Sequence, residues 1–328
     1  MAQGFDAVGI ACLDPSNSPN IPDTSDSDFS SPASLLYHLL NWLSAGYHGT
    51  MHWMTKDPER RADPRKILPG CRSIICVGIN YWTDTCPEEG PGLGKIARYA
   101  WGKDYHRLFK KRLKSLEQAI ARLAPESTTR RYVDTGPVME KIWAQQAGLG
   151  WIGKHSNLVS PVFGSWLLLG EILTTLALEP DAPGTDLCGT CTLCIRACPT
   201  QAITEPYVVD ATKCVSYLTI EYRDDLRTIP PDIRSQMGNR IFGCDDCIDA
   251  CPYNVYAPPT SEPAFLPTPL TQSPKLLQLS RMNEESFART FQGSPIRRAK
   301  HAGFQRNVHV ALSNETSTSK TPSAARQS

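Results

Sequence analysis

The alternation of apolar and polar positions along the first half of the chain predicts strands and helices in turn. Residues 5–13 (FDAVGIACL) form a first apolar run, and 73–80 (SIICVGIN) form a clearer one that is short and β-branched; both predict strands. Between them, residues 33–45 carry apolar side chains at helical spacing and stop at Gly46, which predicts a helix. We expect the polar, Ser- and Pro-rich stretch from 14 to 32 to be a surface loop.

The same alternation continues toward the middle of the chain. Residues 104–123 predict an amphipathic helix with a strongly basic face, and 131–134 (RYVD) predict a short strand that ends on a carboxylate. Residues 138–147 predict a helix closed by Gly148, and 165–177 (SWLLLGEILTTLA) carry one or two more buried strands. Strands that alternate with helices predict an α/β layer in this half.

Proline-rich breaks divide the chain into parts. Pro180 and Pro183 mark one boundary, and Pro and Thr become frequent again near residue 265. The pattern from Pro274 to Asn314 is helical, and the polar end of the sequence is typical of disorder. We therefore predict an α+β protein in four parts: an α/β domain (1–178), a cysteine-rich module (179–265), a short C-terminal helical region (266–314) and a disordered tail (315–328).

Eight of the twelve cysteines share one short stretch, in which two runs end in Cys-Pro: Cys188, Cys191, Cys194, Cys198, Cys214, Cys244, Cys247 and Cys251. The first run reads C-x2-C-x2-C-x3-C-P, the spacing by which bacterial two-cluster ferredoxins hold [4Fe–4S] clusters. The second run lacks its leading cysteine, and Cys214 is the obvious replacement. The spacing predicts a ferredoxin-like module with two [4Fe–4S] clusters.

The crossed ligation of that motif assigns the ligands, because the cysteine before the proline binds the other cluster. One cluster would be held by Cys188, Cys191, Cys194 and Cys251, and the second by Cys198, Cys214, Cys244 and Cys247. Paired zinc sites also use C-x2-C, but they do not need this longer run. A disulfide framework is typical of short secreted chains, which this is not.

The composition limits the possible binding partners of the protein and its possible cellular location. The hydrophobic content of 41% supports a substantial core, and the net charge of +1 gives no global signal for nucleic acid or membrane. The sequence has no run of eighteen apolar residues and no signal peptide, so we expect a cytoplasmic protein that does not bind membranes. A mere electron carrier does not need so large a first domain, which favours an enzyme.

Motifs outside the cysteine array leave alternatives open. The chain has neither a G-x-G-x-x-G after a strand nor a Walker loop, so no nucleotide site of these kinds is indicated. The glycines of 148–154 (GLGWIGK) could let the backbone approach a bulky ligand, or could form a tight turn around a core tryptophan. Asp134, followed by Thr-Gly-Pro, is either a surface-turn residue or a general acid that points into a pocket.

Longer segments resemble the epoxyqueuosine reductase family, the iron–sulfur and cobalamin enzymes of queuosine tRNA modification. Besides the cysteine array, the similar segments follow the family's order: 46–54 (GYHGTMHWM), 61–74 (RADPRKILPGCRSI), 98–113 (RYAWGKDYHRLFKKRL), 131–141 (RYVDTGPVMEK), 147–159 (AGLGWIGKHSNLV), 163–173 (FGSWLLLGEIL), 213–221 (KCVSYLTIE) and 293–314 (GSPIRRAKHAGFQRNVHVALSN). The family usually places a helix before the first strand; this sequence lacks it, so either the start site is misassigned or the protein dispenses with the helix. Many members also append helical repeats, whereas this sequence ends soon after Asn314.

The resemblance implies a base-off cobalamin in the first domain, next to one cluster. The implied reaction reduces the epoxide of epoxyqueuosine to the cyclopentene of queuosine at the wobble position of tRNA, and the oxygen leaves as water. Asp134 matches the family's proton-donor aspartate, and for that role we expect burial to raise its pKa. Asp104-Tyr-His106 lacks the glycine of the D-x-H-x-x-G pattern, so no histidine ligand below cobalt is indicated, and we expect His106 to pack or hydrogen-bond on its helix.

Individual cofactor and RNA contacts are also expectations. A corrin carries many amides, so we expect backbone and mostly neutral side chains to bind it: Asp134, Lys154, His155, Asn157, Leu158, Leu169, Ile172 and Ser216. Core packing is the alternative for the leucines near 169. For tRNA phosphates we predict a basic patch at Arg297, Arg298, Lys300 and Arg306, whereas we interpret the basic helix face at 107–114 as solvated. Tyr217 and Tyr222 could stack on a base, or belong to the module core.

Two other functions compete with this one. A related cobalamin and iron–sulfur reductase could act on a small molecule, as reductive dehalogenases do, although those are typically exported with a twin-arginine signal that this sequence lacks. A non-catalytic electron-transfer protein would hold two clusters and no corrin. In either enzyme an external low-potential donor supplies the electrons, and we expect the chain to act as a monomer.

Overall fold

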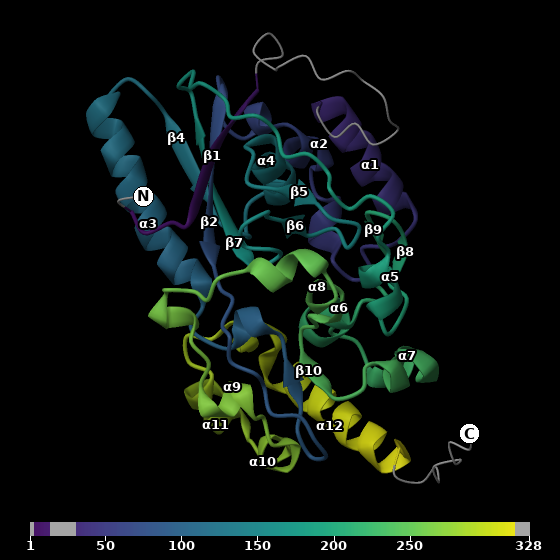
Figure 1. Cartoon of the computed structure of the whole chain (residues 1–328). Coiled ribbons are helices and arrows are strands. Elements are labelled where there is room, and N and C mark those ends of the chain that lie inside the picture. Colours follow the sequence, from purple (N-terminus) through teal and green to yellow (C-terminus); the bar gives the residue numbers. More distant parts are fainter. Residues whose placement is uncertain (1–2, 14–30, 319–328) are drawn as a thin grey trace.

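A four-stranded sheet forms the centre of the first half of the molecule (Figure 1). The computed structural model describes residues 3–13 and 31–318. The strand order is β1 (Ala7–Cys12), β2 (Ser73–Asn80), β7 (Leu167–Thr174) and β4 (Thr129–Tyr132). All three neighbouring pairs are antiparallel. The alternating pattern therefore predicted the mixed helix–sheet layer but not the strand directions.

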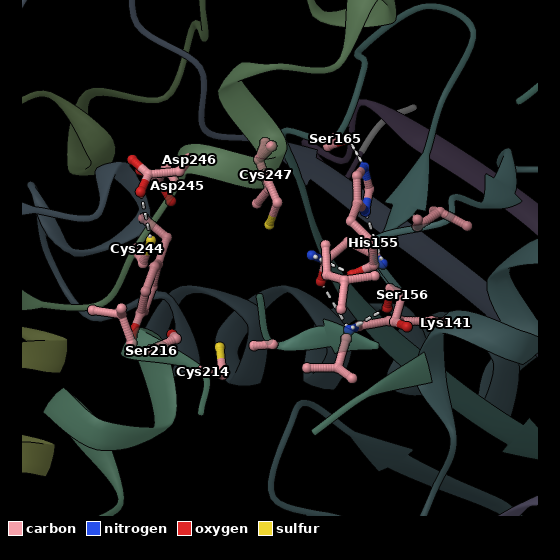
Figure 2. Close-up of a pocket in the computed structure, with 18 of the residues that line it drawn as sticks. Lys141, His155, Ser156, Ser165, Cys214, Ser216, Cys244, Asp245, Asp246 and Cys247 are labelled. Carbon is pink, nitrogen blue, oxygen red and sulfur yellow. Dashed lines mark hydrogen bonds between the residues drawn. The ribbon is translucent and has the colours of Figure 1, made fainter. Parts of the chain in front are cut away.

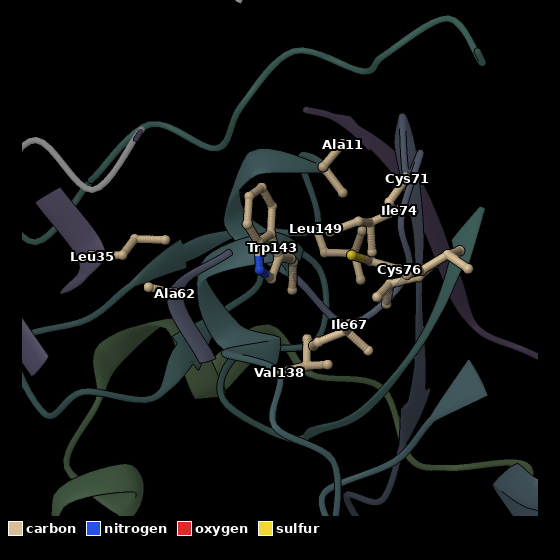
Figure 3. Packing of buried hydrophobic residues seen from close by; sticks show 14 of the residues in the cluster. Ala11, Leu35, Ala62, Ile67, Cys71, Ile74, Cys76, Val138, Trp143 and Leu149 are labelled. Atoms are coloured by element: carbon tan, nitrogen blue, oxygen red, sulfur yellow. The ribbon is translucent and has the colours of Figure 1, made fainter. Parts of the chain in front are cut away.

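Strand β2 shows why the sequence folds this way. All of its residues are buried, because helices cover both faces of the sheet. Since successive side chains of a strand point to opposite faces, Ile74 and Cys76 join one core, and Ile75 and Val77 join the other. Figure 3 shows the first of these cores, in which Trp143 packs near Ile74 and Cys76.

Helices on the two faces complete these cores. Helix α4 (Glu140–Gln146) covers one face together with α1 (Pro32–Ser44) and α2 (Pro58–Ala62). Helix α3 (Tyr105–Leu123) covers the other, where Phe109 and Leu113 are fully buried. Each such side chain contributes roughly 1.5–3 kcal/mol when it leaves water. The Asp104 side chain accepts a hydrogen bond from the N–H of His106 and so caps α3.

The cysteine-rich module consists of short elements to the right of the sheet and below it in Figure 1. They are α5 (Leu193–Ala197), β8 (Ile203–Glu205), β9 (Val208–Val209), α6 (Val215–Ile220), α7 (Pro231–Gln236), β10 (Arg240–Phe242) and α8 (Asp246–Asp249). Helices α5 and α8, which lie within the two cysteine runs, pack against each other. A hairpin of β5 (Trp151–Ile152) and β6 (Leu158–Val159) lies on the α4 side of the sheet.

The C-terminal region is helical, as predicted. It contains α9 (Pro269–Gln272), α10 (Leu276–Ser280), α11 (Glu284–Thr290) and α12 (Lys300–Thr318). Helix α12 continues to Thr318, so Glu315 to Thr318 are helical rather than part of the predicted disordered tail. The rest of that tail, and residues 14–30 of the predicted loop, lie outside the described residues.

One segment of the first domain contributes to the core of the C-terminal region. Strand β3 (Lys95–Ile96) pairs in parallel with β10, and Trp101 is buried in the same core as Phe242 and Phe304. The domain boundaries predicted at residues 178 and 265 stay predictions. Residues from the three parts that these boundaries separate pack in this one core. Within the described ranges, no helix combines the length and the apolar content needed to cross a bilayer.

Most predicted elements match the structure to within a few residues. The segment 165–177 forms a single strand, β7. The RYVD strand ends early, because β4 stops at Tyr132 and leaves Val133 and Asp134 in the following loop. Asp134 has a φ of +56°, in the left-handed region that most residues avoid, so the chain turns there instead of extending the strand.

Candidate functional site

A cavity of about 430 Å³ lies between the sheet domain and the cysteine-rich module (Figure 2). Small-molecule sites commonly have volumes of roughly 300–1,000 Å³. Most of the predicted cofactor and inner-cluster residues line it: Asp134, His155, Asn157, Leu158, Leu169, Ser216, Cys198, Cys214, Cys244 and Cys247. The sequence analysis missed several further lining residues, among them Tyr105, Glu140 and Lys141.

The eight cysteines lie in two groups of neighbours with the same members as the two predicted ligand sets, and the assignment of ligands to clusters stays a prediction. Burial raises the pKa of the Cys194 thiol, and the nearby Cys188, Cys191 and Cys251 raise it further. Burial likewise raises the pKa of Cys247, with further contributions from Cys244, Cys214 and Cys198. No disulfide joins any of the eight cysteines. We call the first four the outer set and the second four, which line the cavity, the inner set.

The outer set is held from the β5–β6 hairpin. Trp151 Nε1 donates a hydrogen bond to Cys188 Sγ at 3.4 Å. Lys154 Nζ donates to the carbonyl oxygens of Gly189 and Cys191, at 2.5 and 3.0 Å. The structure therefore places Lys154, a predicted cofactor contact, against the outer cysteine loop and not on the cavity, because two carbonyls hold its ammonium group there.

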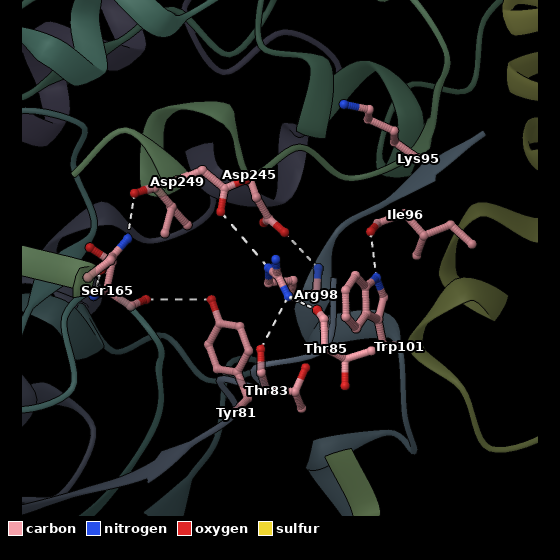
Figure 4. A network of polar contacts seen from close by, with 12 residues as sticks. Tyr81, Thr83, Thr85, Lys95, Ile96, Arg98, Trp101, Ser165, Asp245 and Asp249 are labelled. Carbon is pink, nitrogen blue, oxygen red and sulfur yellow. Dashed lines mark hydrogen bonds and ion pairs between the residues drawn. The ribbon is translucent and has the colours of Figure 1, made fainter. Parts of the chain in front are cut away.

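The inner set is tied to the first domain through Arg98 (Figure 4). The N–H of Arg98 donates to Asp245 Oδ2 at 2.7 Å, and its guanidinium group donates to the carbonyl oxygen of Thr85 at 3.1 Å. The guanidinium group also lies over the rings of Trp82 and Trp101, at 4.4 and 4.6 Å from their centroids. Because Asp245 lies between Cys244 and Cys247, this contact fixes the inner cysteine loop against the sheet domain.

Asp134 lies in a chain of charged groups at the edge of the cavity. Its Oδ2 is 3.3 Å from Nε2 of His106, whose Nδ1 is 2.7 Å from Oδ1 of Asp104. Burial alone would lower the pKa of His106, but the two carboxylates outweigh it and raise the pKa to about 9. At neutral pH the imidazole is therefore protonated.

The expectation that Asp134 has a raised pKa is wrong for this structure. The His106 side chain lowers the pKa of Asp134 by more than burial raises it. The sequence analysis considered burial beside a corrin but not an imidazolium group from a different element. The carboxyl group of Asp134, whose side chain is 59% exposed at the cavity, is thus ionised, and its neighbour His106 carries the proton.

Two carboxyl groups, the half-buried Glu140 and the buried Glu171, lie behind Asp134. Glu140 accepts a hydrogen bond from the N–H of Asp134, and Glu171 on β7 is 0% exposed. Burial, followed by the charge of Asp134, raises the pKa of Glu140 to about 7. Burial and the charge of Glu140 raise the pKa of Glu171 well above its usual value. At neutral pH this pair therefore retains a proton.

His155 and Lys141 line a further part of the cavity. Nδ1 of His155 accepts a hydrogen bond from the N–H of Asn157 at 3.1 Å, and Nε2 lies 3.4 Å from Ser165 Oγ. Burial and the charge of Lys141 lower the pKa of His155 to about 4, so its imidazole is neutral. Lys141 Nζ donates to the carbonyl oxygen of Ser156 and to Asn157 Oδ1, both at 2.8 Å. Lys141 could have been predicted as a site residue from its position in the sequence, just after the Asp134 loop.

Other predicted site residues lie elsewhere. Ile172 is fully buried in the core under α3 and does not reach the cavity. Arg306 donates to the carbonyl oxygens of Leu218 and Tyr222, at 2.7 and 2.9 Å, so it stabilises the fold instead of presenting a free cation.

Three further cations of the predicted basic patch are exposed: Arg297, Arg298 and Lys300. Of these, Arg298 forms two 2.8 Å hydrogen bonds with Glu221. The phenol of Tyr217 accepts a hydrogen bond from the N–H of Thr50 at 2.7 Å, and its ring is buried in the module core. This tyrosine therefore belongs to the core.

Two sets of four thiols beside a cavity lined with acid–base groups define an iron–sulfur redox protein with two clusters. In agreement, residues 187–254 match the family described as "4Fe-4S double cluster binding domain". Residues 61–135 match the family described as "Epoxyqueuosine reductase QueG, DUF1730". An epoxyqueuosine reductase from Synechocystis is 45% identical over 84% of this chain and 94% of the relative. The chain belongs to the epoxyqueuosine reductase family, whose members are oxidoreductases.

Solved structures of this family share the fold. An epoxyqueuosine reductase with an epoxyqueuosine-modified tRNA-Tyr stem loop aligns with a TM-score of 0.83 and 30% identity, covering 97% of this chain and 80% of that one. The epoxyqueuosine reductase from Bacillus subtilis aligns with a TM-score of 0.81 and 29% identity over the same shares of both chains. In that structure a catalytic loop, named for Asp134 in its own numbering, is swung out of the active site.

Proposed function

We propose that this protein reduces the epoxide of epoxyqueuosine in tRNA to the alkene of queuosine. The observation that carries the proposal is the shared cavity, where Asp134 and the inner cysteines Cys198, Cys214, Cys244 and Cys247 line one space. Loss of the epoxide oxygen as water needs two electrons and two protons. The inner cysteines would supply the route for electrons, and the groups around Asp134 supply protons. The family and the tRNA-bound relative support this substrate.

Asp134 acts as the proton donor in this proposal. Opening of the epoxide leaves negative charge on oxygen, and a carboxylic acid that touches this oxygen can protonate it. Because Asp134 is ionised, it must first take a proton, and the imidazolium of His106 is 3.3 Å away. The proton moves from His106 Nε2 to Asp134 Oδ2 and then to the substrate oxygen. The aspartate that gives its name to the catalytic loop of the Bacillus subtilis relative supports this role.

The residues around the cavity fit a base-off cobalamin. Neutral polar side chains (Ser156, Asn157, Ser165, Ser216) match its amides, and apolar ones (Leu167, Leu168, Leu169) match the face of a corrin. His155 has both ring nitrogens engaged within the protein, and its neutral form avoids an extra charge. When bound, cobalamin supplies the low-potential two-electron chemistry that no side chain offers.

The two cysteine sets give the direction of electron flow. The inner set lines the cavity, whereas the outer set contacts Trp151 and Lys154 away from it. An external low-potential donor would therefore reduce the cluster held by the outer set, and electrons would pass to the cluster held by the inner set. The substrate base must leave the RNA stack to reach Asp134, as in other enzymes that act on a single base.

Reconstitution with defined substrates tests the proposal. The anaerobically purified protein, with iron–sulfur clusters and cobalamin, is given a chemical reductant and tRNA that carries epoxyqueuosine, and the nucleosides are separated by mass. We expect queuosine to replace epoxyqueuosine. Full cofactor loading with no queuosine would overturn the proposal. Two clusters without cobalamin binding would indicate an electron-transfer protein, and reduction of small epoxides or halides alone would indicate a small-molecule reductase.

A further inference from the structure

A basic groove runs along the outside of the sheet domain between α3 and β4. Figure 1 shows this helix and strand side by side. The groove is lined by five basic side chains (Lys110, Lys111, Lys114, Arg130 and Arg131) and, among the lining residues, by one carboxylate, Glu117. The net charge of the whole chain hides this concentration of positive charge, because the excess is local.

The cations of α3 form one continuous stripe. Arg107, Lys110, Lys111 and Lys114 are all exposed. Lys110 and Lys111 each lie three or four positions from both Arg107 and Lys114, which places the four on one face of the helix. Like charges at this spacing destabilise a helix by about 0.2–0.5 kcal/mol per pair. The stripe therefore lowers the stability of α3, so folding does not explain why these positions are basic.

Most of these cations lack a partner. Within the part of the chain that the structure describes, Arg131 pairs with Glu117, and no carboxylate pairs with Lys110, Lys114 or Arg130. The predicted C-terminal patch is different, because Arg306 and Arg298 are engaged by carbonyl and carboxylate oxygens. The groove thus has more cations without a carboxylate or carbonyl partner than the predicted C-terminal patch.

The groove leads to the candidate site. Thr135 lines the groove, and its neighbour Asp134 lines the cavity. At this same end of the stripe, next to His106, a guanidinium nitrogen of Arg107 lies near Gly293, which precedes the helical turn that carries Arg297 and Arg298. Free cations therefore extend along the protein surface away from the residue that we propose to be the proton donor.

We propose that the α3–β4 groove binds backbone phosphates of the RNA strand that continues from the modified nucleotide. This inference rests on the proposed function. It assigns the protein an RNA-binding surface outside the predicted C-terminal patch. Free, exposed lysines beside the entry of a base-modifying site match a polyanion whose one nucleotide enters the cavity while its neighbours remain outside.

An acidic electron-donor protein is the other polyanion that could bind a basic groove. The position of the groove relative to the outer cysteines argues against such a donor. Electrons enter at the outer cysteines, which contact Trp151 and Lys154 of the β5–β6 hairpin. That hairpin packs with α4, on the face of the sheet opposite to α3. A donor bound in the groove would therefore be separated from the outer set by the whole sheet.

A charge-reversal pair tests the groove. In Lys110→Glu/Lys114→Glu, we expect the affinity for an anticodon stem-loop RNA at 0.1 M salt to fall on the order of 100-fold, about tenfold for each phosphate that is no longer neutralised. The slope of affinity against salt should flatten by about 2. Fluorescence anisotropy of labelled RNA measures both. Iron content should stay unchanged and Tm should not fall, because both lysines are exposed and the reversal relieves like-charge repulsion along α3.

The matched control reverses two cations elsewhere. Lys275→Glu/Arg281→Glu makes the same change in charge at exposed positions that flank α10, and we expect unchanged RNA binding. If both double variants bind RNA alike, or if the groove variant loses only its reduction by an acidic donor protein, the inference is overturned. If the unaltered protein binds no RNA at all, the proposed function fails instead, so the two failures are distinguishable.

Discussion

The two walls of the cavity differ in kind. The wall from the sheet domain carries groups that hold or release protons, namely Asp134, His106 behind it, and the Glu140–Glu171 pair. The wall from the cysteine-rich module carries the inner thiols, which hold no exchangeable proton once they bind iron. A reduction that removes oxygen as water needs protons and electrons at one place. In the proposed reaction this arrangement would deliver them from opposite sides, so the two supplies can be altered one at a time.

Removal of an inner cysteine breaks the electron side and has the largest expected effect. In Cys214→Ala the inner set, which we predict to supply the four ligands of one cluster, loses one member. We expect iron to fall from about eight to about four atoms per chain and turnover to fall below detection. Iron analysis and nucleoside analysis measure the two effects. Cys86→Ala, at an exposed cysteine outside both sets, is the control and should retain both. Full iron content in Cys214→Ala would contradict the assignment.

Asp134→Asn breaks the proton side and leaves the electron side intact. We expect turnover to fall by roughly 10²–10⁴-fold, the usual contribution of a general acid, with unchanged iron content and cobalamin binding. The pKa of His106 should also fall from about 9, because one of its two carboxylates is lost. Titration of the imidazole by NMR checks this second effect without turnover. Undiminished activity would remove Asp134 from the mechanism.

Arg98→Met removes the guanidinium group, which lies 3.9 Å from Asp249 of the cysteine-rich module, and keeps the backbone N–H that donates to Asp245. The guanidinium side chain is 12% exposed and lies over two tryptophan rings, and its loss leaves the carbonyl oxygen of Thr85 without this donor. We expect the free energy of unfolding to fall by about 3 kcal/mol and the inner cluster to be lost first. Urea unfolding with iron analysis measures both. Arg227→Met, at a surface ion pair with Asp225, should change neither.

His106→Gln has the smallest expected effect on stability, and that effect has a defined pH dependence. The pKa of His106 is raised in the folded protein, so its contribution to stability is fully present below the unfolded pKa of about 6.5 and is lost as the pH rises through about 9. At pH 6 we expect the variant to be less stable than the unaltered protein by on the order of 1 kcal/mol; this value is small because solvent screens the exposed Asp134. At pH 10 we expect the two proteins to be equally stable. Urea unfolding at both pH values measures it. A difference that grows with pH would contradict the ion pair.

Local patterns predicted the parts of the structure that depend on neighbours in sequence. Strand β2 could be predicted because a strand buried on both faces must be apolar throughout. The two cysteine sets could be predicted because the spacing of the motif fixes which thiols approach each other. Asp134 could be singled out by its position after a strand, and a resemblance to known enzymes gave it a role.

Long-range contacts decided what the sequence did not predict. The pKa of Asp134 depends on His106, which belongs to another helix, so burial alone gave the wrong direction. Arg306 belongs to a dense basic run, but carbonyl groups from the distant α6 region bind it. Lys154 and Ile172 lie close in sequence to residues that line the cavity, yet each points elsewhere. In all of these cases the deciding partner is far away along the chain.

The pairing of β3 with β10 has a consequence for synthesis on the ribosome. Lys95 and Ile96 emerge early, but their partners Arg240 to Phe242 are made much later. At a bacterial rate of 5–20 residues per second, the early strand waits on the order of ten seconds for its partner. During that interval Ile96 and Trp101 have no core to enter, and their apolar surfaces are open to association with other chains. The newly made protein should therefore depend on chaperones more than its size suggests, and a fragment that ends before β10 should aggregate.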